Sequence, residues 1–185
     1  MDVHVKPLED NGGREWIIDA DYKNCTNEQD LMLKIKIGAT AFLLFYTLEN
    51  VSKILFTGNR GFHLWLKFTN TFKMTSSQIV RTHRYKAFER PKGRLDVKNI
   101  RPGSFADSVR RAVRMYADEI PNCLTTDINK LMLLYWPDVD KNIFCHANTQ
   151  IRAPFSYNYK GGKFSRCIVK ELIEKCSNGG GESGE

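Results

Sequence analysis

The chain has 185 residues, of which 42% are hydrophobic and 26% charged, and its formal net charge is +7. This composition is typical of a folded globule and excludes a disordered chain, and the length suits one domain. The excess of positive charge suits a polyanionic partner but does not specify a fold.

The first elements follow an irregular lead-in over residues 1–15. A strand is expected over Trp16–Tyr22, which begins apolar and ends polar. Thr26 and Gln29 fit a capping box, so a long helix should follow and end at about Leu48. The second half of that helix is apolar all round, which predicts that it is buried.

A hairpin is expected next, from a short strand over 54–56, a turn over 57–61 and a second strand over 62–68. Alternate residues of the second strand should share a face. Residues 69–103 show little periodicity and carry many positive charges.

The rest of the chain is expected to form an amphipathic helix over 104–120, a helix over 127–135, a strand over 139–144 and a hairpin over 155–169 that turns at Gly161-Gly162. The Gly/Ser/Glu-rich tail, residues 177–185, should be disordered. One domain over 16–176 is therefore predicted. Its class is α/β (α+β), with mixed, largely antiparallel sheets flanked by helices.

The five cysteines are widely spaced and include no Cys-x-x-Cys pair. A disulfide framework or a local zinc knuckle is therefore not expected. We expect buried, reduced thiols, which implies a reducing compartment. The N-terminus lacks a signal-peptide core, and the longest apolar run, 38–48, is too short to span a bilayer. The protein should be soluble and intracellular, with no membrane partner.

Three carboxylates are candidates for metal binding. Asp19 and Asp21 lie at i and i+2 on a strand and should point to the same face. Such a pair repels unless a cation lies between its members, and oxygen ligands suit Mg²⁺ or Mn²⁺. A solvated strand end is the alternative. Asp140 would complete a two-metal cage, and Asp138, which follows a proline and resembles a turn former, is its competitor.

The turn at 57–61 has the composition of a phosphate-binding loop. Gly58 and Gly61 allow backbone N–H groups to approach a phosphate. Arg60 can bind phosphate oxygens with two N–H groups, and His63 could donate to a phosphate or a sugar. The alternative is an ordinary hairpin with a surface arginine and a core histidine, and the Walker pattern is absent.

Residues on either side of Pro154 are further candidates for nucleotide binding. Arg152 could face a triphosphate, and Asn158 could form a hydrogen bond with a nucleotide. A surface arginine and a loop asparagine are the alternative.

The basic stretch 81–101 also contains two aromatic residues, Tyr85 and Phe88. This mixture suits a single-stranded nucleic acid, through phosphate contacts and base stacking. A solvated basic loop, or a surface facing a partner subunit, is the alternative. The template-binding candidates are Arg84, Lys86, Arg90 and Lys92.

Together and in this order, these segments resemble the archaeo-eukaryotic primase superfamily, in its catalytic small subunit. Ile17–Asp21 matches the signature hydrophobic-hydrophobic-Asp-hydrophobic-Asp, and Thr57–Trp65 matches Ser-Gly-x-Arg-Gly-x-His-x-Trp. Val139-Asp140 matches hydrophobic-Asp, and Pro154–Ser156 matches Pro-Phe-Ser. The second and fourth matches are the specific ones, and the matched region runs from about 16 to 168.

Within the superfamily, the chain most resembles the virus-encoded primase subunits of baculoviruses and nudiviruses known as late expression factors. The tryptophan before Asp-x-Asp, the compact size and the missing zinc knuckle carry this narrower resemblance. Cellular subunits differ from the chain in having a Cys-rich zinc module. They also often have an arginine where Asn59 stands, and they carry lysine and histidine in place of Arg152 and Asn158.

The resemblance implies a primase catalytic core with an RRM-like catalytic half. It implies an enzyme, a DNA-directed nucleotidyltransferase that synthesises short RNA primers on single-stranded DNA for viral DNA replication. Two ions, Mg²⁺ or Mn²⁺, would be held by Asp19, Asp21 and Asp140, and no zinc is expected. The nucleotide-binding residues would be Thr57, Gly58, Asn59, Arg60, Gly61, His63, Arg152 and Asn158.

The implied partners are the single-stranded template, NTPs and a large or accessory primase subunit in a heterodimer, and the viral resemblance implies the host nucleus. Three alternative functions remain. They are a primase-polymerase or end-joining polymerase of the same superfamily, a non-catalytic basic module that binds nucleic acid, and a metal-dependent nuclease with the same acidic cage.

Overall fold

The computed structural model describes residues 3–5, 13–121, 124–125 and 127–178. Its strands are β1 (His4–Val5), β2 (Ile17–Asp21), β3 (Val51–Phe56), β4 (Gly61–Leu66), β5 (Asp138–Val139), β6 (Ile151–Arg152), β7 (Tyr157–Asn158), β8 (Lys163–Phe164) and β9 (Arg166–Cys167). Its helices are α1 (Glu28–Tyr46), α2 (Gln78–Tyr85), α3 (Phe105–Met115), α4 (Ile128–Tyr135), α5 (Lys141–Cys145) and α6 (Val169–Asn178), with 3₁₀ turns over Leu48–Asn50 and Val97–Asn99.

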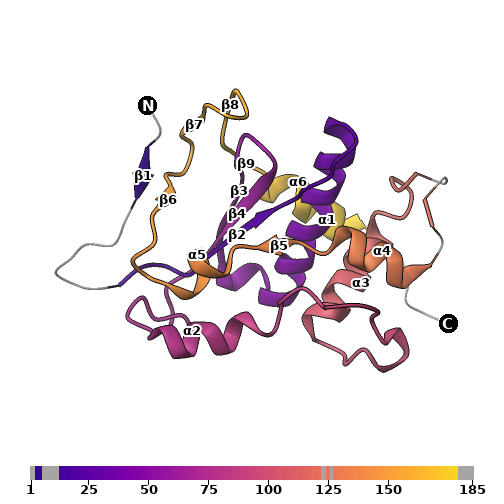
Figure 1. The fold of residues 1–185 in the computed structure, drawn as a ribbon, viewed down its shortest axis with the longest axis horizontal. Coiled ribbons are helices and arrows are strands. Elements are labelled where there is room, and N and C mark those ends of the chain that lie inside the picture. Colours follow the sequence, from indigo (N-terminus) through magenta and orange to yellow (C-terminus); the bar gives the residue numbers. More distant parts are fainter. Residues whose placement is uncertain (1–2, 6–12, 122–123, 126, 179–185) are drawn as a thin grey trace.

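A five-stranded sheet with the order β5-β2-β4-β3-β9 forms the centre of the molecule (Figure 1). All its strand pairs are antiparallel, as are the small sheets β1-β6 and β7-β8. The predicted α/β class with antiparallel sheets and flanking helices is therefore confirmed. Among the described residues, none of the helices combines the length and apolar character that a bilayer crossing requires.

The two faces of the sheet have different roles. Alternate residues of β2, Ile18 and Ala20, belong to the main core, which also contains the apolar side of α1. Ile17 and Trp65 face the other way and pack with Ile143 of α5 in a separate, smaller core. Asp19 and Asp21 share this second face, which α1 does not cover. The pleat of β2 therefore sets the acidic pair apart from the main core.

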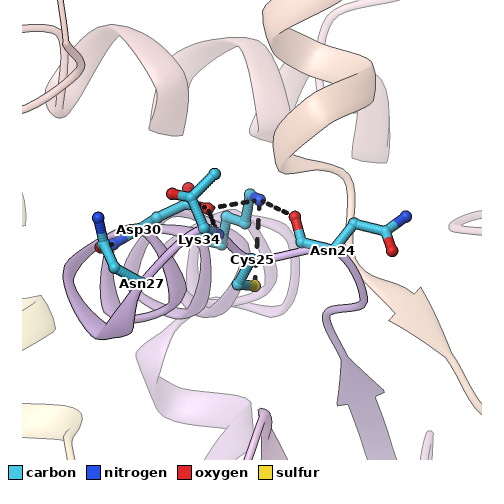
Figure 2. A network of polar contacts seen from close by, with 6 residues as sticks. Asn24, Cys25, Asn27, Asp30 and Lys34 are labelled. Carbon is cyan, nitrogen blue, oxygen red and sulfur yellow. Dashed lines mark hydrogen bonds and ion pairs between the residues drawn. The ribbon is translucent and has the colours of Figure 1, made fainter.

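The start of α1 differs from the predicted capping box. The N-cap is Asn27, whose side chain accepts from the Asp30 N–H at 2.8 Å, while the Asp30 carboxylate accepts from the Thr26 N–H at 2.9 Å. Figure 2 shows the buried ammonium of Lys34 between the Asp30 carboxylate, 3.0 Å away, and the Asn24 carbonyl, 3.2 Å away. This network fixes the loop that joins the end of β2 to the helix.

The expected strand over 139–144 is wrong beyond its first residue. Val139 pairs with Ala20 in β5, but the Asp140 side chain accepts from the backbone N–H groups of Asn142 and Ile143. This capping starts helix α5 at once. The apolar residues 143 and 144 suggested a strand because a short apolar run fits either structure.

Three other segments differ from expectation. β1 lies in the lead-in expected to be irregular, and it pairs with β6, which is distant in sequence. α2 lies in the stretch 69–103, where no element was predicted, and one of its two buried residues is the charged Arg81. α6 continues to Asn178, so its last residues fall in the tail expected to be disordered, while 179–185 lie outside the described residues.

Four described cysteines, Cys25, Cys145, Cys167 and Cys176, are free thiols. Among these four, Cys145 is buried, whereas Cys167 is exposed. The expectation of buried thiols therefore holds for Cys145 and not for Cys167. Cys123 lies outside the described residues.

Two buried arginines join the sheet to α2 and α5. Arg81 donates to the carbonyls of Arg14 at 2.7 Å and Met74 at 3.2 Å, and its guanidinium lies 4.5 Å from the ring centre of Trp16. Arg14 in turn donates to the carbonyls of Ile143 and Thr149. Burial, and then the neighbouring Arg14, lower the pKa of Arg81 to about 10. Arg81 is therefore a structural residue, although the sequence placed it in a basic stretch.

We expect Arg81→Ala to lower the free energy of unfolding by about 3 kcal/mol, because it leaves buried carbonyls without donors and opens a cavity beside Trp16. Urea denaturation followed by circular dichroism measures this change. His83→Ala is the matched control, since His83 is exposed on the same helix. It should change stability by less than about 0.5 kcal/mol. Equal losses in the two variants would contradict the structural role of Arg81.

Candidate active site

Four acidic residues meet where β2 and β5 end. The Asp140 N–H donates to the Asp19 carbonyl at 2.8 Å, so the chain after β5 runs beside Asp19. Asp138 pairs with Asp21 in the register of β5 and β2. All four carboxylates line one cavity of about 230 Å³, together with Lys23 and Arg60. The structure thus brings together the three predicted carboxylates.

Asp138 is a strand residue and not the expected turn former. Because it lies directly opposite Asp21 in an antiparallel pair, its side chain shares the face of Asp21. Its carboxylate is half exposed and lies 3.2 Å from the Lys23 ammonium. Asp138 is therefore paired with Lys23, whereas Asp140 lies next to Asp19.

The electrostatics of Asp19 show that these carboxylates interact. Burial, and then the charges of Asp21 and Asp140, raise the pKa of Asp19 to about 7. A bound cation would relieve this repulsion, and a set of carboxylate oxygens suits a hard divalent ion. The residues present therefore fit such a metal in their chemistry.

The carboxylates nevertheless have protein partners in this structure. Asp21 accepts from the Arg60 Nε–H at 2.8 Å, and Asp140 accepts from the Asn142 N–H at 2.7 Å. Within the described part of the chain, no three His, Cys, Asp or Glu side chains form a ready-made metal site. Metal binding would require Asp21 to exchange Arg60 for the ion.

We expect Asp19→Asn to stabilise the metal-free protein at high pH. The folded-state pKa of about 7 lies above the ordinary value of 3.8, so the protonated form is favoured in the folded state. The stabilisation that comes from this favoured proton is complete below about pH 3.8 and is lost as the pH rises through 7. Asparagine stays uncharged at every pH, so the variant escapes this loss of stability. In EDTA at pH 8 it should be more stable than the wild type by up to about 4 kcal/mol.

Thermal melts of both proteins from pH 5 to pH 8 test this expectation. The difference in melting temperature should grow with pH and level off above about 7. Adding Mg²⁺ at pH 8 should raise the melting temperature of the wild type and leave that of the variant almost unchanged. A difference that does not vary with pH would contradict the raised pKa of Asp19.

The loop after β3 is a tight turn, as predicted. The Thr57 N–H and hydroxyl both donate to the Gly61 carbonyl, each at 3.0 Å. Gly58 has a φ of +79°, and a Cβ there would lie 2.5 Å from the Lys163 carbonyl. A Cβ on Gly61 would collide with the Ala20 carbonyl of the neighbouring strand. Glycine is therefore needed at both positions to seat this loop against β2 and against the β7–β8 hairpin.

A second cavity, of about 290 Å³, adjoins the acidic one and shares Asp19, Asp21 and Arg60 with it. Six of the eight predicted nucleotide-binding residues line this second cavity, and the two glycines support its loop. The six are Thr57, Asn59, Arg60, His63, Arg152 and Asn158. Basic and acidic groups are thus side by side, as a metal–nucleotide ligand requires.

Three further polar residues that line this cavity, His4, Gln150 and Lys160, were not predicted. The pairing of β1 with β6 places His4 beside Arg152. The sequence offered no signal for His4 or Gln150, because this pairing is long-range. Lys160 precedes the predicted Gly161-Gly162 turn, and a cation beside a glycine turn was a usable signal.

His63 is positioned by strand pairing opposite Asp19, and its Nε2 lies 3.5 Å from Asp19 Oδ1. Burial, and then the charge of Arg152, lower the pKa of His63 to about 4. The imidazole is therefore neutral near pH 7, and its contact with Asp19 is not an ion pair. A neutral His63 can donate or accept a hydrogen bond at the cavity wall.

Asn158 has a structural role in addition to its place in the cavity. Its side chain is buried, donates to the Thr57 carbonyl at 3.0 Å, and accepts from the backbone N–H groups of Lys160 and Gly161 at 3.1 and 3.2 Å. It thus ties the loop over 57–61 to the β7–β8 hairpin. Arg152 donates to the Tyr157 carbonyl at 3.3 Å.

The expected template-binding stretch is partly used inside the fold. Tyr85 and Phe88 are buried, so neither ring can stack on a base. Arg90 donates to the carbonyls of Leu133 and Trp136, and the Arg84 guanidinium lies over the rings of Trp16 and Phe72. Lys86 and Lys92 are exposed and can contact phosphates.

Comparisons with known proteins bear on this site. Residues 22–169 match the family model described as DNA primase small subunit. The chain is 65% identical over 186 aligned residues to the DNA primase of Autographa californica nuclear polyhedrosis virus, covering 99% of this chain and 68% of that protein. It is 55% identical over 183 residues to late expression factor 1 of Orgyia pseudotsugata multicapsid polyhedrosis virus, covering 96% and 72%.

Proposed function

The chain belongs to the DNA primase small-subunit family, and we propose that it catalyses the synthesis of short RNA primers on single-stranded DNA by two-metal nucleotidyl transfer. One observation carries the chemistry of this proposal. The acidic cavity and the basic cavity share Asp19, Asp21 and Arg60, so carboxylates and phosphate-binding groups form one continuous site.

The proposed metal ligands are Asp19, Asp21 and Asp140, and the oxygen-only donors suit Mg²⁺ or Mn²⁺. A metal pair bound there would supply activation of the attacking 3′-hydroxyl and neutralisation of charge on the phosphates. Asp19 must lose its proton to serve as a ligand, and its pKa of about 7 means that it does so near neutral pH.

The cationic residues of the chain bind and orient the triphosphate in this proposal. Arg60 leaves Asp21 and takes the phosphate oxygens, which frees the carboxylate at the same time. His63, neutral and buried, contributes a hydrogen bond and no charge. Arg152 and Lys160 line the same cavity. Their positions suit the β- and γ-phosphates that leave as pyrophosphate.

The proposal extends to partners and location. The relatives are viral proteins, one of them named DNA primase, which supports a role in viral DNA replication in the nucleus of the host cell. A large or accessory primase subunit would form a heterodimer with this chain, and the exposed Lys86 and Lys92 would contact template phosphates.

A primer-synthesis assay tests the proposed function. The purified chain is given an unprimed single-stranded DNA, labelled NTPs and Mg²⁺ or Mn²⁺, with and without a candidate large subunit. Short labelled RNA products are expected. Products formed only from dNTPs, or only on existing ends, would favour a primase-polymerase or end-joining polymerase. Degradation of the template without NTPs would favour a nuclease, and binding without any product would favour a non-catalytic module.

A further inference from the structure

The β7–β8 hairpin carries a cluster of aromatic rings that faces solvent. Tyr159 is 60% exposed and Phe164 is 66% exposed. The ring of Tyr157 lies between them, with centroids 5.0 Å from Tyr159 and 5.1 Å from Phe164. Exposed aromatic rings leave apolar area in contact with water, and a bound ligand removes that area from water. A cluster of this kind therefore marks a binding surface.

The charged residues of the hairpin segment itself are all of one sign. The segment 151–170 contains no Asp or Glu, and its cations are Arg152, Lys160, Lys163, Arg166 and Lys170. Lys163 pairs with Glu28, and Arg166 pairs with Glu171 at 2.6 Å. Exposed pairs of this kind contribute little to stability and can be exchanged for phosphates. Positive charge interleaved with exposed rings suits a single strand of nucleic acid.

The hairpin is continuous with the cavity of the proposed nucleotide site. Lys160 lines that cavity, and the Asn158 side chain is bonded to the Thr57 carbonyl of the phosphate-binding loop. The backbone at Gly58 is packed so closely against Lys163 that a Cβ has no space. Figure 1 shows the hairpin at the margin of the molecule, next to the turn between β3 and β4. A strand lying over the rings would therefore lead into the site.

We propose that Tyr159 and Phe164 form a stacking platform for unpaired bases of the DNA template, with the neighbouring cations on its phosphates. The inference rests on the proposed function, since a template strand is the ligand assumed. Every base has a flat face, so such stacking tolerates any sequence, as a template surface must. The buried rings of Tyr85 and Phe88 cannot provide this contact.

The test is the double variant Tyr159→Ala/Phe164→Ala. Binding of a short labelled oligodeoxythymidine is followed by fluorescence anisotropy, without NTPs or divalent metal. The Kd is expected to rise about 10-fold or more. The dependence of log Kd on log salt should keep its slope, because no cation is removed. Replacing both residues by tryptophan should restore tight binding.

The matched control is Phe68→Ala. Phe68 is 68% exposed and follows the end of β4 that lies away from the phosphate-binding loop, so its loss should leave the Kd unchanged. Thermal melts check that each variant is folded. Both platform residues are exposed, so their replacement should not move the melting temperature.

Wild-type affinity in the double variant would overturn the platform while leaving the proposed function intact. So would equal sensitivity of a duplex of the same length, because paired bases cannot stack on side chains. Conversely, loss of single-strand binding in the double variant supports the platform even if the wild type makes no primers. In that case the proposed function fails by its own assay.

Discussion

Replacing Asp21 by asparagine is expected to reduce primer synthesis by at least about 1000-fold while the protein keeps its fold. Asp21 is one of the two carboxylates shared by the acidic and basic cavities, and its side chain is 34% exposed. The substitution removes a charge that the proposed metal pair requires and changes little of the packing. Incorporation of labelled NTPs into product on an unprimed template measures the effect.

Asp138→Asn is the matched control for this prediction. Asp138 lies opposite Asp21 on β5 and lines the same cavity, but its carboxylate is paired with Lys23. It should lose less than about 10-fold in activity, since exposed ion pairs are weak. A loss as large as that of Asp21→Asn would make Asp138 a member of the metal cage. Full activity of Asp21→Asn would defeat the assignment of the cage itself.

The family and the fold class were both predictable from the sequence, and both are confirmed. The reason is that their signals are local. The alternation of β2 alone places Asp19 and Asp21 on one face, and the glycines with Arg60 mark a turn before β4. Such features depend on neighbours in the chain and not on the rest of the fold.

The relation of Asp140 to the acidic pair was not predictable in the same way. It depends on the pairing of β5 with β2 and on helix α5, which begins where a strand was expected. His4 and Gln150 entered the cavity through a long-range pairing of two short strands. Local sequence carries no information about a partner more than a hundred residues away.

The basic stretch 81–101 contains buried residues that composition alone does not reveal. Sequence does not distinguish a buried arginine that donates to backbone carbonyls from a solvated one, and Arg81 is fully buried. Tyr85 and Phe88 interrupt the charges because they belong to the core. The hairpin rings at 159 and 164 have the same pattern of aromatic and basic residues, yet they lie at the surface. Only burial separates these two cases.

Replacing Arg60 by alanine is expected to weaken NTP binding by about 100-fold and DNA binding by less than about 3-fold. A charge-assisted, two-pronged contact to phosphate contributes about 1.5–3 kcal/mol, and a 100-fold loss, about 2.7 kcal/mol, lies in the upper part of that range. Titration with a fluorescent NTP analogue and anisotropy with an oligonucleotide measure the two affinities. Arg111→Ala is the control, because Arg111 is exposed on α3 and does not line either cavity. Equal NTP affinity in wild type and Arg60→Ala would contradict the role of this residue.

The pair between Arg60 and Asp21 makes this prediction sharper. In the metal-free protein the Asp21 carboxylate holds the Arg60 guanidinium at 2.8 Å, so the carboxylate and the nucleotide phosphates compete for one cation. In EDTA, Asp21→Asn should therefore bind NTP at least as tightly as the wild type, although it makes no primers. Adding Mg²⁺ should strengthen NTP binding to the wild type and have little effect on the variant. An Asp21→Asn protein that loses NTP affinity in EDTA would show that the carboxylate positions Arg60 for the nucleotide and does not compete for it.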